Sequence, residues 1–197
     1  MSIIRGIAPP NLPVAPRNYE QKYLDQLSNV LRIFFNSITS EINAPVGHAS
    51  YYDTTTQTNP VANQVNLFTF DSVVNEFQIE RGVPTSKIYV ANTGMYNIQF
   101  SAQLDKTGGG ADTVYIWPRV NGQNLPNSAT KVVIDGPNNE IVPAWNFFID
   151  LKAGDYFELA WQSNDTAVVI LAEPASGNIP GIPSIILTMS YVSRLEQ

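Results

Sequence analysis

Few residues in this 197-residue chain could carry out catalysis. Cysteine is absent, which excludes disulfides, thiolate nucleophiles and Cys-ligated zinc. The single histidine, His48, would have to serve any Ser–His–acid triad, and the chain contains no Gly-x-Ser-x-Gly motif. We therefore expect no catalytic residue, no metal site and no cofactor. We interpret His48 as a structural or solvent-exposed residue.

Paired carboxylates are the next candidates, because glycoside hydrolysis needs two acids about 5–10 Å apart. Asp150 and Asp155 flank an expected turn, and Asp71, Glu76 and Glu80 follow one β segment. Turn formation and solvent exposure explain these positions better than catalysis does. A polysaccharide depolymerase therefore ranks last among the functions that we consider.

A glycine-rich segment, 105–112, is superficially like an ion- or phosphate-binding loop. It contains Gly108, Gly109 and Gly110, but it lacks the ligand spacing of an EF-hand and the Lys-Ser/Thr ending of a P-loop. We interpret it as a flexible hairpin tip, with an ion site as the alternative. Such an exposed tip is also a place where a receptor could be contacted.

The composition disfavours nucleic acid and membrane partners. Charged residues make up 14% of the chain, against about 25% in an average globular protein. The net charge is −6 without any Lys/Arg cluster, whereas a phosphate-binding surface needs concentrated positive charge. No stretch approaches the ~20 apolar residues of a membrane span, and residues 1–16 lack the apolar core of a signal peptide. So few charges indicate a surface that is polar and neutral or is covered by partners.

The first 17 residues form an arm that contains four prolines and should be extended. A disordered tail is one interpretation, but free tails are normally poor in large aliphatic residues. We therefore predict an arm that becomes ordered on a partner. Its docking residues would be Ile3, Ile4, Ile7, Leu12 and Val14.

A helix is expected over residues 18–43, with Asn18 as N-cap, Gln21 as its capping-box partner and Pro45 ending it. One apolar row has the 3, 4, 3, 4 spacing of a coiled coil: Leu24, Leu27, Leu31, Phe34 and Ile38. A second row widens it: Tyr23, Val30, Phe35 and Ile42. We predict that the first row joins sister subunits or an anchoring surface. Packing of the helix on its own β domain is the alternative.

After Pro45 the apolar pattern changes to period two, which is typical of half-buried strands. The clearest run is 96–104, a shorter one covers 77–79, and about nine or ten strands are expected, with a type I′ hairpin turn at Asn121-Gly122. Many short antiparallel strands predict a sandwich or jelly roll. The domains expected are thus an arm at 1–17, a helix at 18–44 and an all-β sandwich at 45–197.

Aromatic residues are frequent in the expected strands. Trp117, Trp145 and Trp161 should fill the sandwich core or a subunit interface, with a carbohydrate-stacking platform as the alternative. Tyr51 and Tyr52 are adjacent in a strand and must therefore point to opposite faces.

Three motifs in residues 46–192 resemble the C1q/TNF-like jelly-roll superfamily. They are Gly94 to Phe100, like its Gly-x-Tyr-x-Phe strand; Val120-Asn121-Gly122, like its Asn-Gly turn; and Leu151 to Leu159, like its Leu-x-x-Gly-Asp-x-x-x-Leu strand pair. The segment 49–56 departs from the family by lacking its Phe-rich first strand. Members are compact trimers, so the resemblance implies an antiparallel jelly-roll sandwich and a homotrimer.

Residues 10–36 look like the N-terminus of structural proteins of tailed phages, particularly marine and cyanobacterial ones. The resemblance lies in Pro10 to Pro16 and in Tyr19, Tyr23, Leu27 and Leu31 to Asn36. It implies a virion surface protein that assembles in the host cytoplasm and decorates or cements the capsid, or forms a short tail fibre or knob. Other virion proteins would be partners. A receptor-binding head for host glycan is the alternative.

Overall fold

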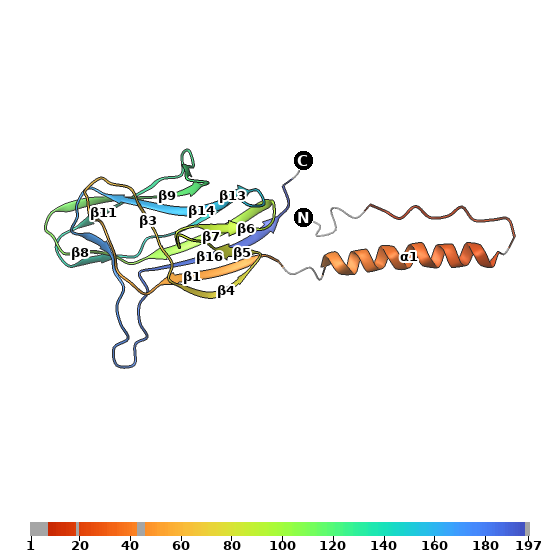
Figure 1. The fold of residues 1–197 in the computed structure, drawn as a ribbon, viewed down its shortest axis with the longest axis horizontal. Helices are drawn as coiled ribbons and strands as arrows, with labels where there is room; N and C mark the ends of the chain where they lie inside the picture. The colour runs from red at the N-terminus through yellow and green to blue at the C-terminus, as the bar shows by residue number, and fades with distance from the viewer. Residues whose placement is uncertain (1–7, 19, 43–45, 196–197) are drawn as a thin grey trace. The chain divides into compact units, whose positions relative to one another are not determined.

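The computed structural model describes residues 8–18, 20–42 and 46–195. The chain divides into two compact units, Met1–Pro45 and Val46–Gln197. The first contains the helix and the second contains the strands (Figure 1). Three predicted docking residues of the arm, Ile3, Ile4 and Ile7, lie outside the described residues.

Helix α1 spans Gln21–Ile42, which is three residues shorter at its start than we predicted. The carbonyl oxygen of Glu20 accepts the first backbone hydrogen bonds, from Tyr23 at 3.1 Å and from Leu24 at 3.4 Å. The N-cap position is therefore Glu20, and the prediction of Asn18 was wrong. Asn18 instead lies in a bend before the helix, so residue type alone placed the cap too early.

The arm before the helix has a burial pattern with period three. Pro10, Pro13 and Pro16 are half-buried, whereas the residues between them are exposed. A polyproline II helix has three residues per turn, so one face of the arm is covered along residues 10–16.

The described strands form three antiparallel sheets. Sheet A has the order β13 (Ala144–Leu151), β7 (Gly94–Ala102), β16 (Ile185–Ser193), β1 (His48–Asp53) and β4 (Ser72–Phe77). Sheet C has the order β10 (Gln123–Asn124), β9 (Ala111–Val120), β14 (Tyr156–Ser163), β6 (Ile88–Val90) and β5 (Ile79–Arg81), with β11 (Thr130–Asp135) on β9 and β3 (Asn66–Leu67) on β14. Sheet B has the order β12 (Asn139–Ile141), β8 (Leu104–Lys106), β15 (Val168–Ile170) and β2 (Gln57–Thr58).

The strand order confirms a mostly antiparallel β fold with one N-terminal helix, in a jelly-roll-like sandwich. The last strand, β16, lies between β7 and β1, so the C-terminal strand completes the sheet that the first strand begins. Such non-local pairing is what separates a jelly roll from a simple meander of hairpins.

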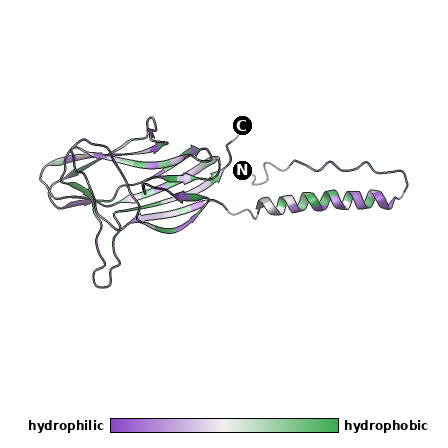
Figure 2. Cartoon of the chain, in the orientation of Figure 1, coloured by the Kyte–Doolittle hydropathy of each residue, from purple (hydrophilic) through white to green (hydrophobic). Residues whose placement is uncertain are grey.

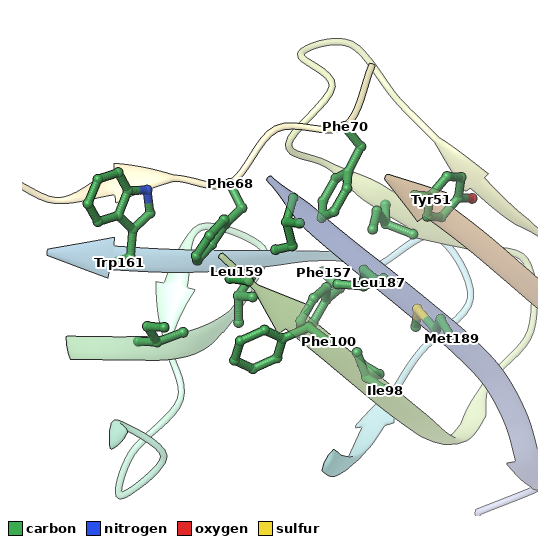
Figure 3. Packing of buried hydrophobic residues seen from close by; sticks show 14 of the residues in the cluster. Tyr51, Phe68, Phe70, Ile98, Phe100, Phe157, Leu159, Trp161, Leu187 and Met189 are labelled. Carbon is green, nitrogen blue, oxygen red and sulfur yellow. The ribbon is translucent and has the colours of Figure 1, made fainter. Parts of the chain in front are cut away.

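The core is made by side chains from all three sheets, mostly from sheets A and C (Figure 3). Phe100 of β7 and Trp161 of β14 both pack against Phe68, with ring centroids 6.4 and 6.0 Å from the Phe68 ring. Tyr51 of β1 similarly contacts Phe70, at 6.1 Å. Because the alternating apolar residues of both sheets point into this space, the β unit buries its own hydrophobic surface.

Two predicted strands are interrupted where the chain changes sheet. The run 96–104 breaks at Gln103, because β7 belongs to sheet A and β8 to sheet B. The run 77–79 breaks at Gln78, which has a positive φ of 58° and separates β4 from β5. In both cases the alternation of apolar residues continues through the break, so periodicity alone could not show it.

The hairpin turn at Asn121-Gly122 is confirmed. The two residues have φ of 51° and 76°, as a type I′ turn requires, and they connect β9 to β10. The segment after β15 forms a protruding hairpin over residues 173–182 (Figure 1), closed by the bridges Glu173↔Ile182 and Ser176↔Ile179.

Candidate functional site

The apolar row of α1 is only partly covered. Leu27, Leu31, Phe34 and Ile38 are half-buried, and Leu24 keeps 38% of its surface exposed. Of the second row, Tyr23 and Val30 are half-buried and Phe35 is 58% exposed. Figure 2 shows the green apolar residues along the helix. None of the helix residues whose side chains are described is buried, so this surface is open to a further partner.

The two described docking residues of the arm face solvent. Leu12 is 49% exposed and Val14 is 93% exposed, whereas the prolines beside them are half-buried. Within residues 10–16 the arm therefore presents its aliphatic side chains outward and its prolines inward. These two side chains are available to a partner, and their docking stays a prediction.

The glycine loop is not the hairpin tip that we predicted. Within residues 46–195, β8 pairs with strands of sheet B and β9 with strands of sheet C, so Gly108, Gly109 and Gly110 lie in a crossing between sheets. The sequence did not reveal the role of Lys106, which is fully buried. Its Nζ atom forms an ion pair with Asp112 Oδ2 at 2.5 Å. Its Nζ also donates to the carbonyl oxygen of Gly110. A buried ion pair thus fixes both ends of the loop.

The candidate carboxylates serve local structure. Asp155 accepts a hydrogen bond from the Lys152 amide at 2.8 Å and from the Asn121 amide group at 2.7 Å, which joins two turns. Asp71 accepts from the Thr54 backbone amide at 3.0 Å. Burial would raise the pKa of Asp71, but hydrogen bonds from Thr54 and Ser72 outweigh it and lower the pKa.

His48 is exposed at the start of β1. Its Nδ1 lies 2.8 Å from the Val46 carbonyl oxygen, and its ring lies 6.1 Å from the Phe77 ring.

Among the residues that the structure describes, no group of three His, Asp or Glu side chains could hold a metal ion. In the same part of the chain, no helix combines the length and apolar character of a membrane span.

The tryptophans and the tyrosine pair lie where the sequence predicted. Trp161 is buried in the core, Trp117 is buried and donates to Asn124 at 2.8 Å, and Trp145 packs on Phe100 at 5.4 Å. Tyr51 points into the core, whereas Tyr52 is half-buried on the other face of β1.

The outer face of sheet A brings together polar side chains that are far apart in sequence. The strand registers align two rows across all five strands. One row is Phe77, His48, Ser190, Asn97 and Phe148. The next row is Asn75, Ser50, Thr188, Gln99 and Asn146. We call these ten residues the neutral face, because none carries a formal charge with histidine neutral.

A hollow of about 370 Å³ lies in the middle of the neutral face. Its polar lining is His48, Ser50, Asn75, Asn97, Gln99, Thr188 and Ser190. The Oδ1 atom of Asn97 is buried there and has no hydrogen-bond partner among the described residues. A buried carbonyl oxygen without a donor is rare in native proteins.

Sequence reasoning found only a part of the neutral face. Alternation correctly placed Asn97 and Gln99 on the polar side of their strand. It could not place Ser190 or His48 beside them, because these residues are neighbours only through the order β7-β16-β1. The one available signal was that β7 and β16 contain no charged residue.

Comparison with known proteins does not assign this chain to a group. A scan against protein-family models found no match. A search of curated proteins likewise found no matching sequence.

Proposed function

We propose that this protein is a non-enzymatic structural component of a phage virion surface, present as a homotrimer with a C1q/TNF-like jelly-roll head. The arm and α1 anchor it to other virion proteins. The observation that supports the proposal is that the two apolar rows of α1 stay partly exposed from Tyr23 to Ile38. We call these two rows together the stripe. The resemblance of residues 10–36 to phage structural proteins supports the virion assignment.

The exposed apolar area of α1 favours self-association. Burying apolar area contributes about 25 cal/mol per Å² before the costs of association. The stripe has the heptad spacing at which helices pack against one another. Three copies would hide Leu24, Leu31 and Phe35 from water, and the arms could occupy the outer grooves between helices.

The helix variants Leu31→Asp and Phe34→Asp test this assembly. A carboxylate placed in the stripe would have to be desolvated at a helix contact, so the trimer should dissociate to monomers. Analytical ultracentrifugation of the full chain measures the change. Asn36→Asp is the matched control, because it adds the same charge at an exposed polar position of α1 and should leave the trimer intact.

Two outcomes would contradict the proposal. One is a wild-type chain that is monomeric at high concentration, and the other is a Leu31→Asp variant that remains trimeric and enters particles normally. Electron microscopy of particles labelled with antibody to the sandwich would place the head on the capsid, as decoration or cement, or on the tail, as a short fibre or knob.

A further inference from the structure

We propose that the hairpin of residues 173–182, which we call the finger, binds the neutral face of a sister copy and joins neighbouring heads of the trimer. The finger connects β15 to β16 and protrudes past the edge strand β4, away from its own sheets (Figure 1). The assignment rests on the proposed homotrimer, in which it adds a contact between heads to the contact made by α1.

The finger is held by its own backbone, but the part of the chain that the structure describes does not cover it. Glu173 and Ile182 exchange two hydrogen bonds of 2.9 Å, and Ser176 and Ile179 exchange two of 3.1 and 3.0 Å. Gly177 has the positive φ, 60°, that a type II′ turn needs at its first central position. All residues from 173 to 181 are exposed. A two-stranded hairpin alone is only marginally stable in water, so a covering partner would stabilise the finger.

The prolines of the finger limit how it can bind. Pro174 and Pro180 lie on opposite legs of the hairpin, and each lacks a backbone N–H group. Neither leg is therefore suited to pair with the edge of another sheet. Binding is left to the side chains and to the tip, where Ile179 is 64% exposed.

The absence of charge indicates the class of partner. Residues 174–193 contain no charged side chain, although charged residues make up 14% of the chain. This segment includes most of the finger and all of β16, the central strand of sheet A. The cores of protein interfaces are depleted of charge, whereas anionic ligands are recognised by Arg or Lys. An uncharged protein surface is therefore the partner that fits the finger.

A sister copy supplies such a surface in its neutral face. Phe148 and Phe77, at the two ends of its first row, are 60% and 37% exposed. The nearest carboxylate on β13, that of Asp150, lies one row further, at the border of the face. The hollow of about 370 Å³ gives room for the tip of the finger, whose Ser176 and Asn178 can hydrogen-bond the hydroxyl and amide groups of its lining.

The contact joins two different surfaces, a finger on one copy and a neutral face on the next. Because the finger extends away from its own sheets, the face that it reaches belongs to another copy (Figure 1). A heterologous contact of this kind generates a ring when the rotation closes, and a ring of three copies is the proposed trimer. Each head would then use its finger on one neighbour and its neutral face on the other.

Photo-crosslinking of the full-length protein tests the contact. The chain has no cysteine, so Ile179→Cys introduces a single thiol, which is labelled with benzophenone maleimide. Irradiation should give covalent dimers and trimers on a denaturing gel, and mass spectrometry should place the link on β1, β16 or β7 of sheet A. Val133→Cys, labelled in the same way at an exposed position of β11 in sheet C, should give no link between copies.

A charge at the same position measures how much the finger contributes to assembly. Ile179→Asp alters an exposed side chain, so the head should fold normally while the dissociation constant of the trimer rises about tenfold. Val133→Asp adds the same charge in sheet C and should leave that constant unchanged. Sedimentation equilibrium measures the constant, and tryptophan fluorescence reports whether each variant is folded.

Two results would overturn this contact and leave the proposed trimer standing. One is a labelled Ile179→Cys protein that has trimeric mass but forms no link between copies, or forms its link on sheet C. The other is a trimer that Ile179→Asp weakens no more than Val133→Asp does. A wild-type chain that is monomeric would overturn both the contact and the proposed function.

Discussion

The two units of this chain differ in how they cover their apolar residues. In the sandwich, large side chains such as Tyr51, Phe68 and Trp161 are removed from water almost entirely. In the helical unit, none of the helix side chains that the structure describes is buried, and Phe35 is mostly exposed. The sandwich encloses a core of its own, whereas the helix leaves its apolar surface partly open to another molecule.

The difference also appears at single side chains, charged in one unit and aliphatic in the other. The sandwich buries the charged side chain of Lys106 and compensates it with Asp112. The arm leaves the aliphatic Val14 almost fully exposed. We infer that stability is concentrated in residues 46–195 and that association is concentrated in the arm and α1.

Replacing one aromatic residue of each unit by alanine should give the largest difference in the loss of stability. Phe68→Ala removes a ring that contacts Phe100 and Trp161, and it should lower the free energy of unfolding by about 3–5 kcal/mol. Phe35→Ala removes an exposed ring of α1 and should leave the unfolding of the sandwich unchanged. Urea denaturation followed by tryptophan fluorescence measures both. Equal losses would show that the two units share one core.

Breaking the buried ion pair between Lys106 and Asp112 should give the next largest loss of stability. Lys106→Met leaves the Asp112 carboxylate buried without its cation and should cost about 3–5 kcal/mol of unfolding free energy. Adding Asp112→Leu should recover most of that loss, because no unpaired charge remains. Lys131→Met, at an exposed position, is the control. If Lys106→Met proves as mild as this control in a thermal melt, the pair is not buried.

A smaller effect is expected at alkaline pH. Burial is the main cause that raises the pKa of Tyr51, with a further contribution from Glu76, above the usual 10.0. The neutral hydroxyl is therefore favoured in the folded state. This stability is present below pH 10 and is lost as the pH rises through the folded pKa.

Tyr51→Phe should reduce the slope of stability against pH above 10. Some slope should remain, because burial also raises the pKa of Tyr96. Phe at this position also removes hydrogen bonds to Glu76 and to the Ile79 carbonyl oxygen, which should cost about 1 kcal/mol at neutral pH. Denaturation midpoints between pH 8 and 11 measure the slope, and identical slopes in both proteins would show that Tyr51 does not titrate in this way.

The sequence predicted those features that depend on local periodicity. Alternation located the strand beginning near Gly94 and the inward side of Tyr51, and the Asn121-Gly122 turn needed only its two residue types. The helix was predicted with its N-terminus displaced, because Asn18 is a favourable cap residue and Glu20 is not.

Features that depend on pairing between distant strands could not be predicted from the sequence. Lys106 and Asp112 looked like solvent-facing residues of a flexible loop, because their burial depends on the crossing from sheet B to sheet C. The neutral face requires β16 to lie between β7 and β1, which no local pattern specifies. Register across several strands is a property of the whole fold.

The oligomeric mass of the intact chain tests the central claim most directly. Sedimentation equilibrium over a wide concentration range should give three times the chain mass of 21.7 kDa. It should also show dissociation when the stripe of α1 is made charged. A single species of 21.7 kDa at the highest concentrations would contradict the account, because the exposed stripe of α1 would then need no second copy.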